Sequence, residues 1–314
     1  MPMARSAPAR RRALRRLPLT VSASVFAVAL LASACGGSDA DSGAADSTTS
    51  SSSATTGSSG GTADLTAGFR QASWGSNVTV TFEDGRLHYV SDGLPNHERD
   101  AEYALPNAGV RVPDAATATA GADPTVAQSY DYTIPLTPTK AAASTSTSLG
   151  VIGVMISGAS LFNPYEGDGA TVATASNFSV KNASGQDVFF LDDCAGHPTP
   201  MGQYHYHALP RCVTATVDEA DGPSHIIGIA FDGYPIYGDR DIDGKQVTAG
   251  DLDKCNGITS ATPEFPEGVY HYVLLDVADS TSSIRCFTGV VSDSLASMTG
   301  MPGMLGRGGP PPPA

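Results

Sequence analysis

Two histidines that lie two residues apart are the residues of this chain best suited to chemistry. They belong to the tetrad Tyr204–His207, which reads Tyr-His-Tyr-His in a segment typical of a β-strand. Successive side chains of a strand point to opposite faces, so His205 and His207 share one face, about 6.5–7 Å apart. The two tyrosines are expected to face the core. Two imidazoles at this spacing can close on one metal ion, so the tetrad predicts a metal site.

Further histidines could complete this site. We expect His197, His205 and His207 to form it, with His97 and His225 as additional ligands. Imidazole suits Zn²⁺ and Cu²⁺, which are the expected cofactors, and three histidines with an open coordination position could activate water. Carboxylates that could hold these ligands in place are Asp192, Asp193 and Asp232. The chemistry would then be that of a metal-dependent hydrolase or oxidase, or metal binding alone.

Two interpretations without a metal remain open. Histidines on a strand face often pack in the core and bond to a carbonyl or carboxylate, which would make the domain a structural or recognition module. A histidine beside Asp192 or Asp193 could also act as a general base. The sequence has no Gly-x-Ser-x-Gly elbow, Walker loop or dinucleotide fingerprint. Whether the chain is an enzyme stays open, and convergence of the imidazole rings on one point is the decisive observation.

An internal repeat supplies the elements that must position these residues. Four landmarks occur twice in the same order: a glycine-punctuated apolar segment, a Leu-Asp-x-Cys-x-Gly motif, a Tyr-His-Tyr motif and a cysteine. The matching pairs are 152–163 with 227–238, 191–196 with 252–257, 204–206 with 270–272, and Cys212 with Cys286. We therefore predict two pseudo-symmetric repeats, at about 150–212 and 225–286.

The two repeats differ at the histidines. His205 corresponds to His271, but the places of His197 and His207 hold Ile258 and Val273 in the second copy. One active half and one scaffold half is the sharper interpretation, although sequence drift explains the difference too.

Strand patterns dominate residues 65–292. Val78–Phe82 alternates, and Leu87–Val90 returns after a Glu-Asp-Gly turn, which indicates a hairpin. Strands are also expected at 172–180 and 187–191. No segment keeps a 3.6-residue periodicity over three turns, and glycine and proline are abundant. We predict an all-β fold, a single β-rich domain resembling a sandwich or a barrel, built from the two repeats and stapled by disulfides.

The staples are expected from four cysteines: Cys194, Cys212, Cys255 and Cys286. An even number of cysteines in an exported domain suggests two disulfides. Four cysteines allow three pairings, and locality favours Cys194–Cys212 and Cys255–Cys286. A cysteine metal site is the alternative, but the sequence has no Cys-x-x-Cys pair.

The N-terminus indicates export. Residues 1–34 combine six arginines with an apolar run from Leu17 to Ala34, which is typical of a signal peptide. Cys35 follows small residues and resembles the lipidated cysteine of a bacterial lipobox, although Ala32 stands where leucine is usual. Ordinary cleavage after Ala34 is the alternative. The arginine-rich start does not decide between general and twin-arginine secretion. We expect a lipoprotein anchored to the outer face of the cell membrane.

The remaining chain has few features that suggest other partners. Residues 35–64 are rich in Gly, Ser and Thr and read as a flexible tether. Removal of the signal leaves 32 acidic residues against 12 basic ones, a formal net charge of −20, which argues against nucleic-acid binding. Membrane contact is expected through the anchor only, and other partners are a metal ion or a small ligand.

Residues 293–314 read as a disordered tail rich in Met, Gly and Pro, unless its thioethers bind Cu(I).

Together these motifs resemble the YHYH domain family of bacterial exported proteins. The similarity covers nearly all of residues 70–290 and rests on five segments: 91–97, 150–163, 191–197, 204–207 and 225–237. Members often carry a second complete Cys-Asn-Gly-His and a second tetrad, whereas this chain has Ile258 and Val273 at the last positions of those motifs. A role that needs two complete sites is therefore not expected. The resemblance implies export but names no reaction.

Overall fold

The computed structural model describes residues 63–298. The expected signal peptide, Cys35, nearly all of the tether and the tail methionines Met301 and Met304 lie outside the described residues. Most regular structure is β-strand, and the helices are short: α1 (Thr66–Phe69), α2 (Arg211–Thr214) and α3 (Asp293–Met298). No helix in the described range is long and apolar enough to cross a membrane.

The largest sheet carries the tetrad. It has eight strands in the order β11-β12-β8-β7-β13-β14-β16-β15. Their bounds are β7 (Val151–Met155), β8 (Ser160–Phe162), β11 (Gly196–Pro198), β12 (Tyr204–Tyr206), β13 (Ile226–Ala230), β14 (Pro235–Tyr237), β15 (Gly257–Ser260) and β16 (Val269–Val273). The central pair β7 and β13 is antiparallel, while β12 with β8 and β14 with β16 are parallel.

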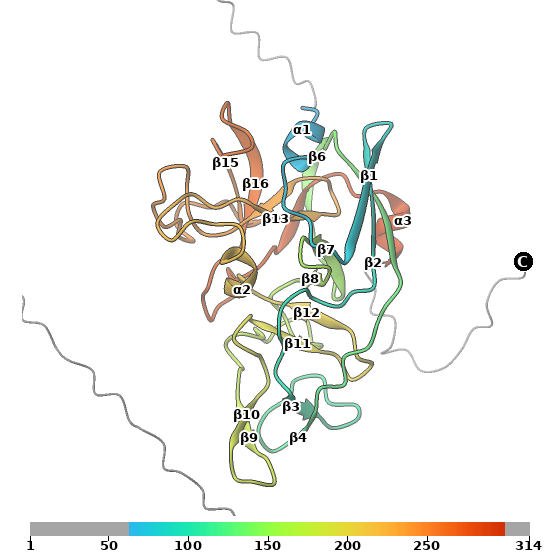
Figure 1. Cartoon of the computed structure of the whole chain (residues 1–314), viewed down its shortest axis with the longest axis vertical. Coiled ribbons are helices and arrows are strands. Elements are labelled where there is room, and N and C mark those ends of the chain that lie inside the picture. The colour runs from blue at the N-terminus through green and yellow to red at the C-terminus, as the bar shows by residue number, and fades with distance from the viewer. Residues whose placement is uncertain (1–62, 299–314) are drawn as a thin grey trace, which may run out of the picture. The chain divides into compact units, whose positions relative to one another are not determined.

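Four smaller sheets accompany it (Figure 1). They are β1 (Val78–Glu83) with β2 (Arg86–Ser91) and β5 (Tyr130–Pro135), β3 (Glu102–Pro106) with β4 (Ala118–Ala122), β9 (Ser179–Lys181) with β10 (Asp187–Phe189), and β6 (Lys140–Ser146) with β17 (Cys286–Gly289). The β3–β4 and β9–β10 pairs lie side by side at the lower end of the view in Figure 1. None of the described sheets closes on itself, so the barrel form of the prediction is wrong and the β-rich class is confirmed.

The core centres on β7 and β13, whose residues are all buried. Two glycines allow these strands to approach closely. A Cβ on Gly153 would lie 2.8 Å from the carbonyl oxygen of Ile229, and one on Gly228 would lie 2.6 Å from that of Val154. Any larger residue at either position would push the central strands apart, which explains why both apolar segments carry a glycine there.

Two disulfides connect the turns of the large sheet to other elements. Cys194 in the turn before β11 bonds Cys212 of α2, and Cys255 in the turn before β15 bonds Cys286 of β17. These are the pairs that locality favours. The bonds close loops of 18 and 31 residues, and loops of such length contribute about 3–4 kcal/mol each to the free energy of unfolding.

Of two strand predictions made from local sequence, one is confirmed and the other is largely wrong. The expected first hairpin is confirmed as β1–β2, and its turn places Asp84 and Gly85 at φ 50° and 69°, as a two-residue hairpin turn requires. The strand expected at 172–180 is wrong for most of its length, because only its end belongs to β9. Ser176 bonds back to the carbonyl oxygens of Val172 and Ala173 through its N–H and its hydroxyl, which keeps this segment in a turn.

Candidate metal centre

The β11–β12 hairpin brings three histidines together. His197 on β11 stands directly opposite His205 on β12, and His207 follows two residues later on the same face. Their exposed fractions are 7, 2 and 3 %, so all three rings are buried. One ring nitrogen from each lies within 4.8 Å of the others. The imidazoles therefore converge as the sequence spacing predicts.

Backbone carbonyls fix the orientation of two of these rings. Nδ1 of His207 donates to the carbonyl oxygen of Asn163 at 2.7 Å, and Nδ1 of His205 donates to that of Gln203 at 3.2 Å. A carbonyl oxygen only accepts, so the hydrogen of each neutral ring sits on Nδ1 and the lone pair on Nε2. The two Nε2 atoms are 3.0 Å apart. Nε2 of His197 is buried and has no hydrogen-bond partner in the described residues.

Burial keeps these rings uncharged. It lowers the pKa of His197 and of His205 well below the usual 6.5, and each is lowered further by a neighbouring histidine of the cluster. Burial also lowers the pKa of His207 to about 4, with a partial opposing effect from the Asn163 carbonyl. At neutral pH the cluster consists of neutral imidazoles, which is the form that binds metals.

Aromatic rings hold the histidines from the sides. Phe162 of β8 stacks on His205 with centroids 3.8 Å apart, and Phe190 lies 4.2 Å from the ring of His197. On the opposite face of β12, Tyr204 and Tyr206 are fully buried in the core, as the alternation predicts. The site is therefore built on a strand that is packed on both sides.

Asp192 positions the turn that leads into His197. Its Oδ1 accepts hydrogen bonds from the N–H groups of Cys194 and Gly196, at 2.9 and 3.1 Å. Its Oδ2 accepts from the hydroxyls of Tyr103 and Tyr204, at 2.8 and 2.7 Å. No hydrogen bond or ion pair joins the Asp192 carboxylate to an imidazole of the cluster in the described structure, so this carboxylate shapes the backbone that carries His197.

Asp253 forms the same kind of turn before β15 and provides a matched control. Its Oδ1 accepts from the N–H groups of Cys255 and Gly257, and its Oδ2 accepts from the hydroxyl of Tyr270. That hydroxyl also bonds Thr288, so it keeps a partner when Asp253 is removed.

Asp192→Ala is expected to weaken metal binding by about 10-fold, the lower end of the range for groups that orient ligands, because Asp192 acts on His197 through the backbone. It should also lower the free energy of unfolding by about 2–4 kcal/mol, because two buried tyrosine hydroxyls lose their acceptor. Asp253→Ala should leave metal affinity unchanged. Isothermal titration with Zn²⁺ and urea unfolding of both variants measure this, and equal affinities for the two would contradict the positioning role.

The other predicted site residues lie elsewhere. Nε2 of His97 bonds the hydroxyl of Tyr206, which is on the opposite face of β12 from the cluster, and its Nδ1 bonds the carbonyl of Glu98. His225 pairs with Glu264 at 2.8 Å. Neither residue belongs to the group of three histidines: the ligand atom of His97 lies with the sulfur atoms of the Cys194–Cys212 disulfide, and His225 pairs with Glu264.

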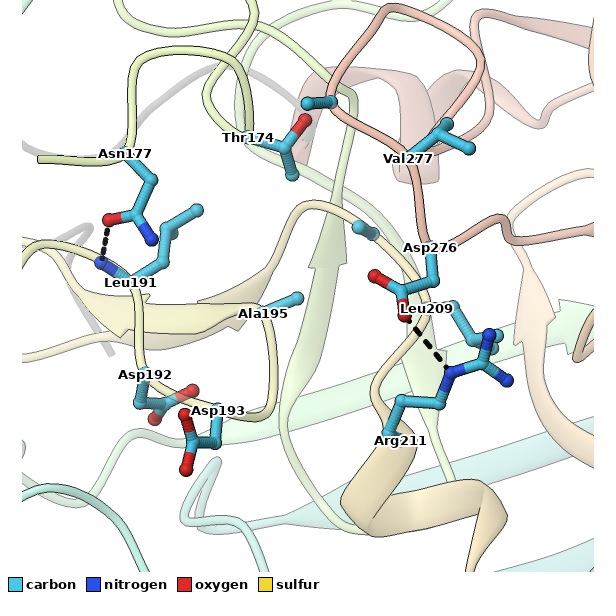
Figure 2. A pocket seen from close by; sticks show the side chains of 12 residues that line it. Thr174, Asn177, Leu191, Asp192, Asp193, Ala195, Leu209, Arg211, Asp276 and Val277 are labelled. Atoms are coloured by element: carbon cyan, nitrogen blue, oxygen red, sulfur yellow. Dashed lines mark hydrogen bonds and ion pairs between the residues drawn. The ribbon is translucent and has the colours of Figure 1, made fainter.

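Two predicted carboxylates also lie apart from the histidines. Asp232 is buried between β13 and β14, where its Oδ2 accepts from the Tyr272 hydroxyl at 2.6 Å and from the N–H of Gly289 at 2.8 Å. Asp193 is exposed at a shallow pocket of about 350 Å³. Figure 2 shows Asp192 and Asp193 on one side of that pocket and the ion pair of Arg211 with Asp276 on the other.

A larger cavity opens beside the histidines. Its volume is about 530 Å³, and His197, His205 and His207 all line it. Its walls include Phe162, Tyr165, Phe190, Pro200 and Met201, and its acidic residue is Glu166. Burial raises the pKa of Glu166 to about 7.

Sequence reasoning missed Glu166. It stands in an Asn-Pro-Tyr-Glu segment that carries no recognisable motif. Only the fold places this carboxyl in the cavity, so no sequence signal could have found it.

A family model described as "YHYH protein" matches residues 131–247 and 241–289, which together span half of the chain. The matched region contains the three clustered histidines and all four disulfide cysteines. No curated protein and no solved structure matches the chain.

Proposed function

The chain belongs to the YHYH protein family, and we propose that its domain binds one transition-metal ion through His197, His205 and His207. One observation carries this proposal. Nε2 of His205 and Nε2 of His207 face each other at 3.0 Å while both Nδ1 atoms are committed to carbonyl oxygens. Two lone pairs at this distance repel, and a cation between them removes the repulsion. Protons suit this place poorly, because burial lowers the pKa of both rings.

The donor set fits a tetrahedral metal. Zn–N bonds of about 2.0–2.1 Å place neighbouring ligand nitrogens about 3.3–3.4 Å apart. This value lies between the 3.0 Å that separates the Nε2 atoms of His205 and His207 and the 4.8 Å within which the ligand nitrogens of all three histidines lie. Histidine ligands usually donate their second N–H to a carbonyl or carboxylate, as His205 and His207 do. Zn²⁺ and Cu²⁺ are the ions that imidazole sets of this kind favour.

The group holds three protein donors within the described residues, so a fourth position is left for a ligand from the cavity. Three protein ligands with one open position are typical of catalytic rather than structural zinc sites. The open coordination position therefore favours a metal site that binds a small molecule from the cavity.

We expect the mature protein, purified after export into an oxidising compartment, to retain about one Zn or Cu per chain through dialysis. Elemental analysis of the dialysed protein measures the content, before and after loading with each ion. Absence of metal even after loading would remove the proposal and leave packed histidines as the interpretation.

We further propose that this domain is exported and anchored to the outer face of the cell membrane by lipid on Cys35. The arginine-rich start, the apolar run and the lipobox-like cysteine support this, and disulfides are typical of exported domains. Membrane contact then occurs through the anchor alone, and the acidic mature chain does not bind nucleic acid. Fatty-acid labelling in a bacterial host tests the anchor, since Cys35→Ser should abolish the label.

We also propose that the large sheet arose by duplication, with the metal site kept in one copy. The pairing in the first half, β7–β8 antiparallel, β8–β12 parallel and β12–β11 antiparallel, matches β13–β14, β14–β16 and β16–β15 in the second. Superposition of residues 150–212 on 225–286 in an experimental structure tests this, and misaligned β11 and β15 would contradict it.

Equivalent side chains support the same proposal. Ser157 contacts the Tyr206 hydroxyl at 2.9 Å, and at the matching place Asp232 accepts from the Tyr272 hydroxyl at 2.6 Å. Ile258 and Val273 replace two of the three ligands in the second half. The second half therefore offers a site-free comparison within the same molecule.

A further inference from the structure

We propose that Glu166 is the proton-transfer residue of a hydrolytic reaction in the cavity, acting on compact, uncharged, largely apolar esters. This inference rests on the proposed metal site, because the three histidines line the same cavity as Glu166. The carboxylate does not belong to the group of ligand atoms that lie within 4.8 Å of one another. It lines the same cavity as the three histidines, where it can contact a water molecule or a substrate.

The backbone holds Glu166 firmly. Its N–H donates to the carbonyl oxygen of Thr171, and its own carbonyl accepts from the N–H of Gly169. Asp168 closes the intervening loop by accepting from the N–H groups of Ala170 and Thr171, both at 2.9 Å. A catalytic group must be held in a fixed geometry by its neighbours, and this loop supplies that support.

The carboxyl group itself is weakly engaged. Within the described chain its hydrogen bond comes from the Ser176 hydroxyl, at the long distance of 3.4 Å. The residue is 6 % exposed. A buried carboxyl normally has good hydrogen-bond partners, so one with a single long bond in a cavity is free to bond a ligand.

The charged and titratable groups around Glu166 favour a proton acceptor that works near neutral pH. Burial raises the pKa of Glu166 most, the Ser176 hydroxyl lowers it and Asp168 raises it, and together they bring the pKa to about 7 in the metal-free protein. The three histidines of the cavity are neutral, and Arg111 lies at an exposed position of the lining. General bases are most effective when their pKa lies near the working pH.

The cavity walls indicate the class of substrate. Its volume of about 530 Å³ is within the range of small-molecule sites. Phe162, Tyr165, Phe190 and Met201 make the walls largely apolar. Apart from the proposed metal and Glu166, which the reaction uses, the lining offers a charged substrate no buried counter-charge to replace its hydration, so an uncharged acyl compound fits best.

The reaction balances with water as the second reactant. Glu166 accepts a proton from water while the water oxygen forms a bond to the acyl carbon. The bond from that carbon to the alkoxy oxygen then breaks, and the protonated Glu166 gives its proton to the leaving oxygen. The products are a carboxylic acid and an alcohol, and Glu166 returns to its starting form. The metal supplies Lewis-acid polarisation of the reacting oxygens when it is bound.

The test compares zinc-loaded mature wild-type protein with Glu166→Gln, using phenyl acetate as the probe. We expect the variant to keep its zinc and to lose about 100-fold or more in kcat/KM, the usual contribution of a general acid–base residue. Glu166→Asp keeps a carboxylate and should recover part of the activity.

Glu264→Gln is the matched control, because Glu264 is also buried, at 8 % exposure, but bonds His225 and Tyr237 outside the cavity. It should hydrolyse phenyl acetate at the wild-type rate. Zinc bound by the wild type without hydrolysis, or equal rates for wild type and Glu166→Gln, would overturn the role of Glu166 alone. Failure to bind zinc, measured before substrate is added, would instead overturn the proposed function.

Discussion

His205→Ala should abolish stoichiometric metal binding, with the dissociation constant for Zn²⁺ raised at least about 100-fold. His205 provides one of the two facing Nε2 atoms and lies between His197 and His207, with ring centroids 4.5 and 4.7 Å from theirs. Without it, His197 and His207 remain as two ligands with centroids 5.3 Å apart. Elemental analysis and isothermal titration on the folded protein measure the loss.

His271→Ala is the control that separates coordination from packing. Nδ1 of His271 donates to the Val269 carbonyl at 3.0 Å, just as His205 donates to Gln203 at 3.2 Å. The two histidines are 5 % and 2 % exposed. His271 also packs against an aromatic ring, that of Tyr237, at 4.8 Å. Both variants should therefore cost similar stability, while His271→Ala keeps the metal.

The outcome decides between the metal site and packed histidines. If the histidines only pack, both variants lower the midpoint of thermal unfolding to a similar extent. Added Zn²⁺ then leaves the midpoints of both variants and of the wild type unchanged. If they bind metal, Zn²⁺ raises the midpoint of the wild type and of His271→Ala but not that of His205→Ala, because a ligand stabilises only the folded form that binds it. Metal retained in full by His205→Ala would contradict the site.

Short-range patterns predicted the part of the site that lies on one hairpin. The two-residue period of a strand is enough to place His205 and His207 on one face and Tyr204 and Tyr206 on the other. His197 joins them because β11 and β12 are close neighbours in sequence and pair directly. The disulfide pairing could be favoured for the same reason, since both bonds close loops of moderate length.

Contacts between distant segments could not be predicted in this way. His97 bonds Tyr206, 109 residues away, and His225 bonds Glu264, 39 residues away. The local sequence of each histidine does not indicate these distant partners, so both histidines were predicted to be available as metal ligands. Glu166 is the opposite case, because its own loop looks ordinary and the cavity forms only when β8, β11 and the segment after β3 come together. Closure of the sheets likewise depends on long-range pairing, which explains why the barrel alternative could not be excluded.

The same buried histidines should make the metal-free protein sensitive to acid. The pKa of His207 is lowered from 6.5 to about 4 by burial. Between these pH values the unfolded chain binds a proton at this residue that the folded chain does not. The free energy of unfolding therefore falls as the pH falls from 6.5 to 4, and the contribution of His207 to that fall is about 3 kcal/mol.

Two buried carboxyl groups act in the opposite direction. Burial raises the pKa of Asp232 to about 6 and that of Glu166 to about 7. The folded chain binds protons there that the unfolded chain does not, so these groups add stability as the pH falls through those values. The wild-type pH profile is thus a sum of opposing contributions, and a comparison of variants is needed to isolate the histidine.

The difference in free energy of unfolding between wild type and His207→Gln isolates the contribution of His207, because the contributions of the carboxyl groups largely cancel. In EDTA this difference should shrink by about 3 kcal/mol between pH 6.5 and 4, as measured by urea unfolding at several pH values.

His271→Gln should behave alike in EDTA, since burial lowers the pKa of His271 to about 4 as well. Zn²⁺ should then separate the two: it occupies the Nε2 atoms of the cluster, stabilises His271→Gln as it does the wild type, and leaves His207→Gln nearly unaffected. A pH-independent difference in EDTA would contradict the buried, neutral state of His207, and equal effects of Zn²⁺ on both variants would contradict its role as a ligand.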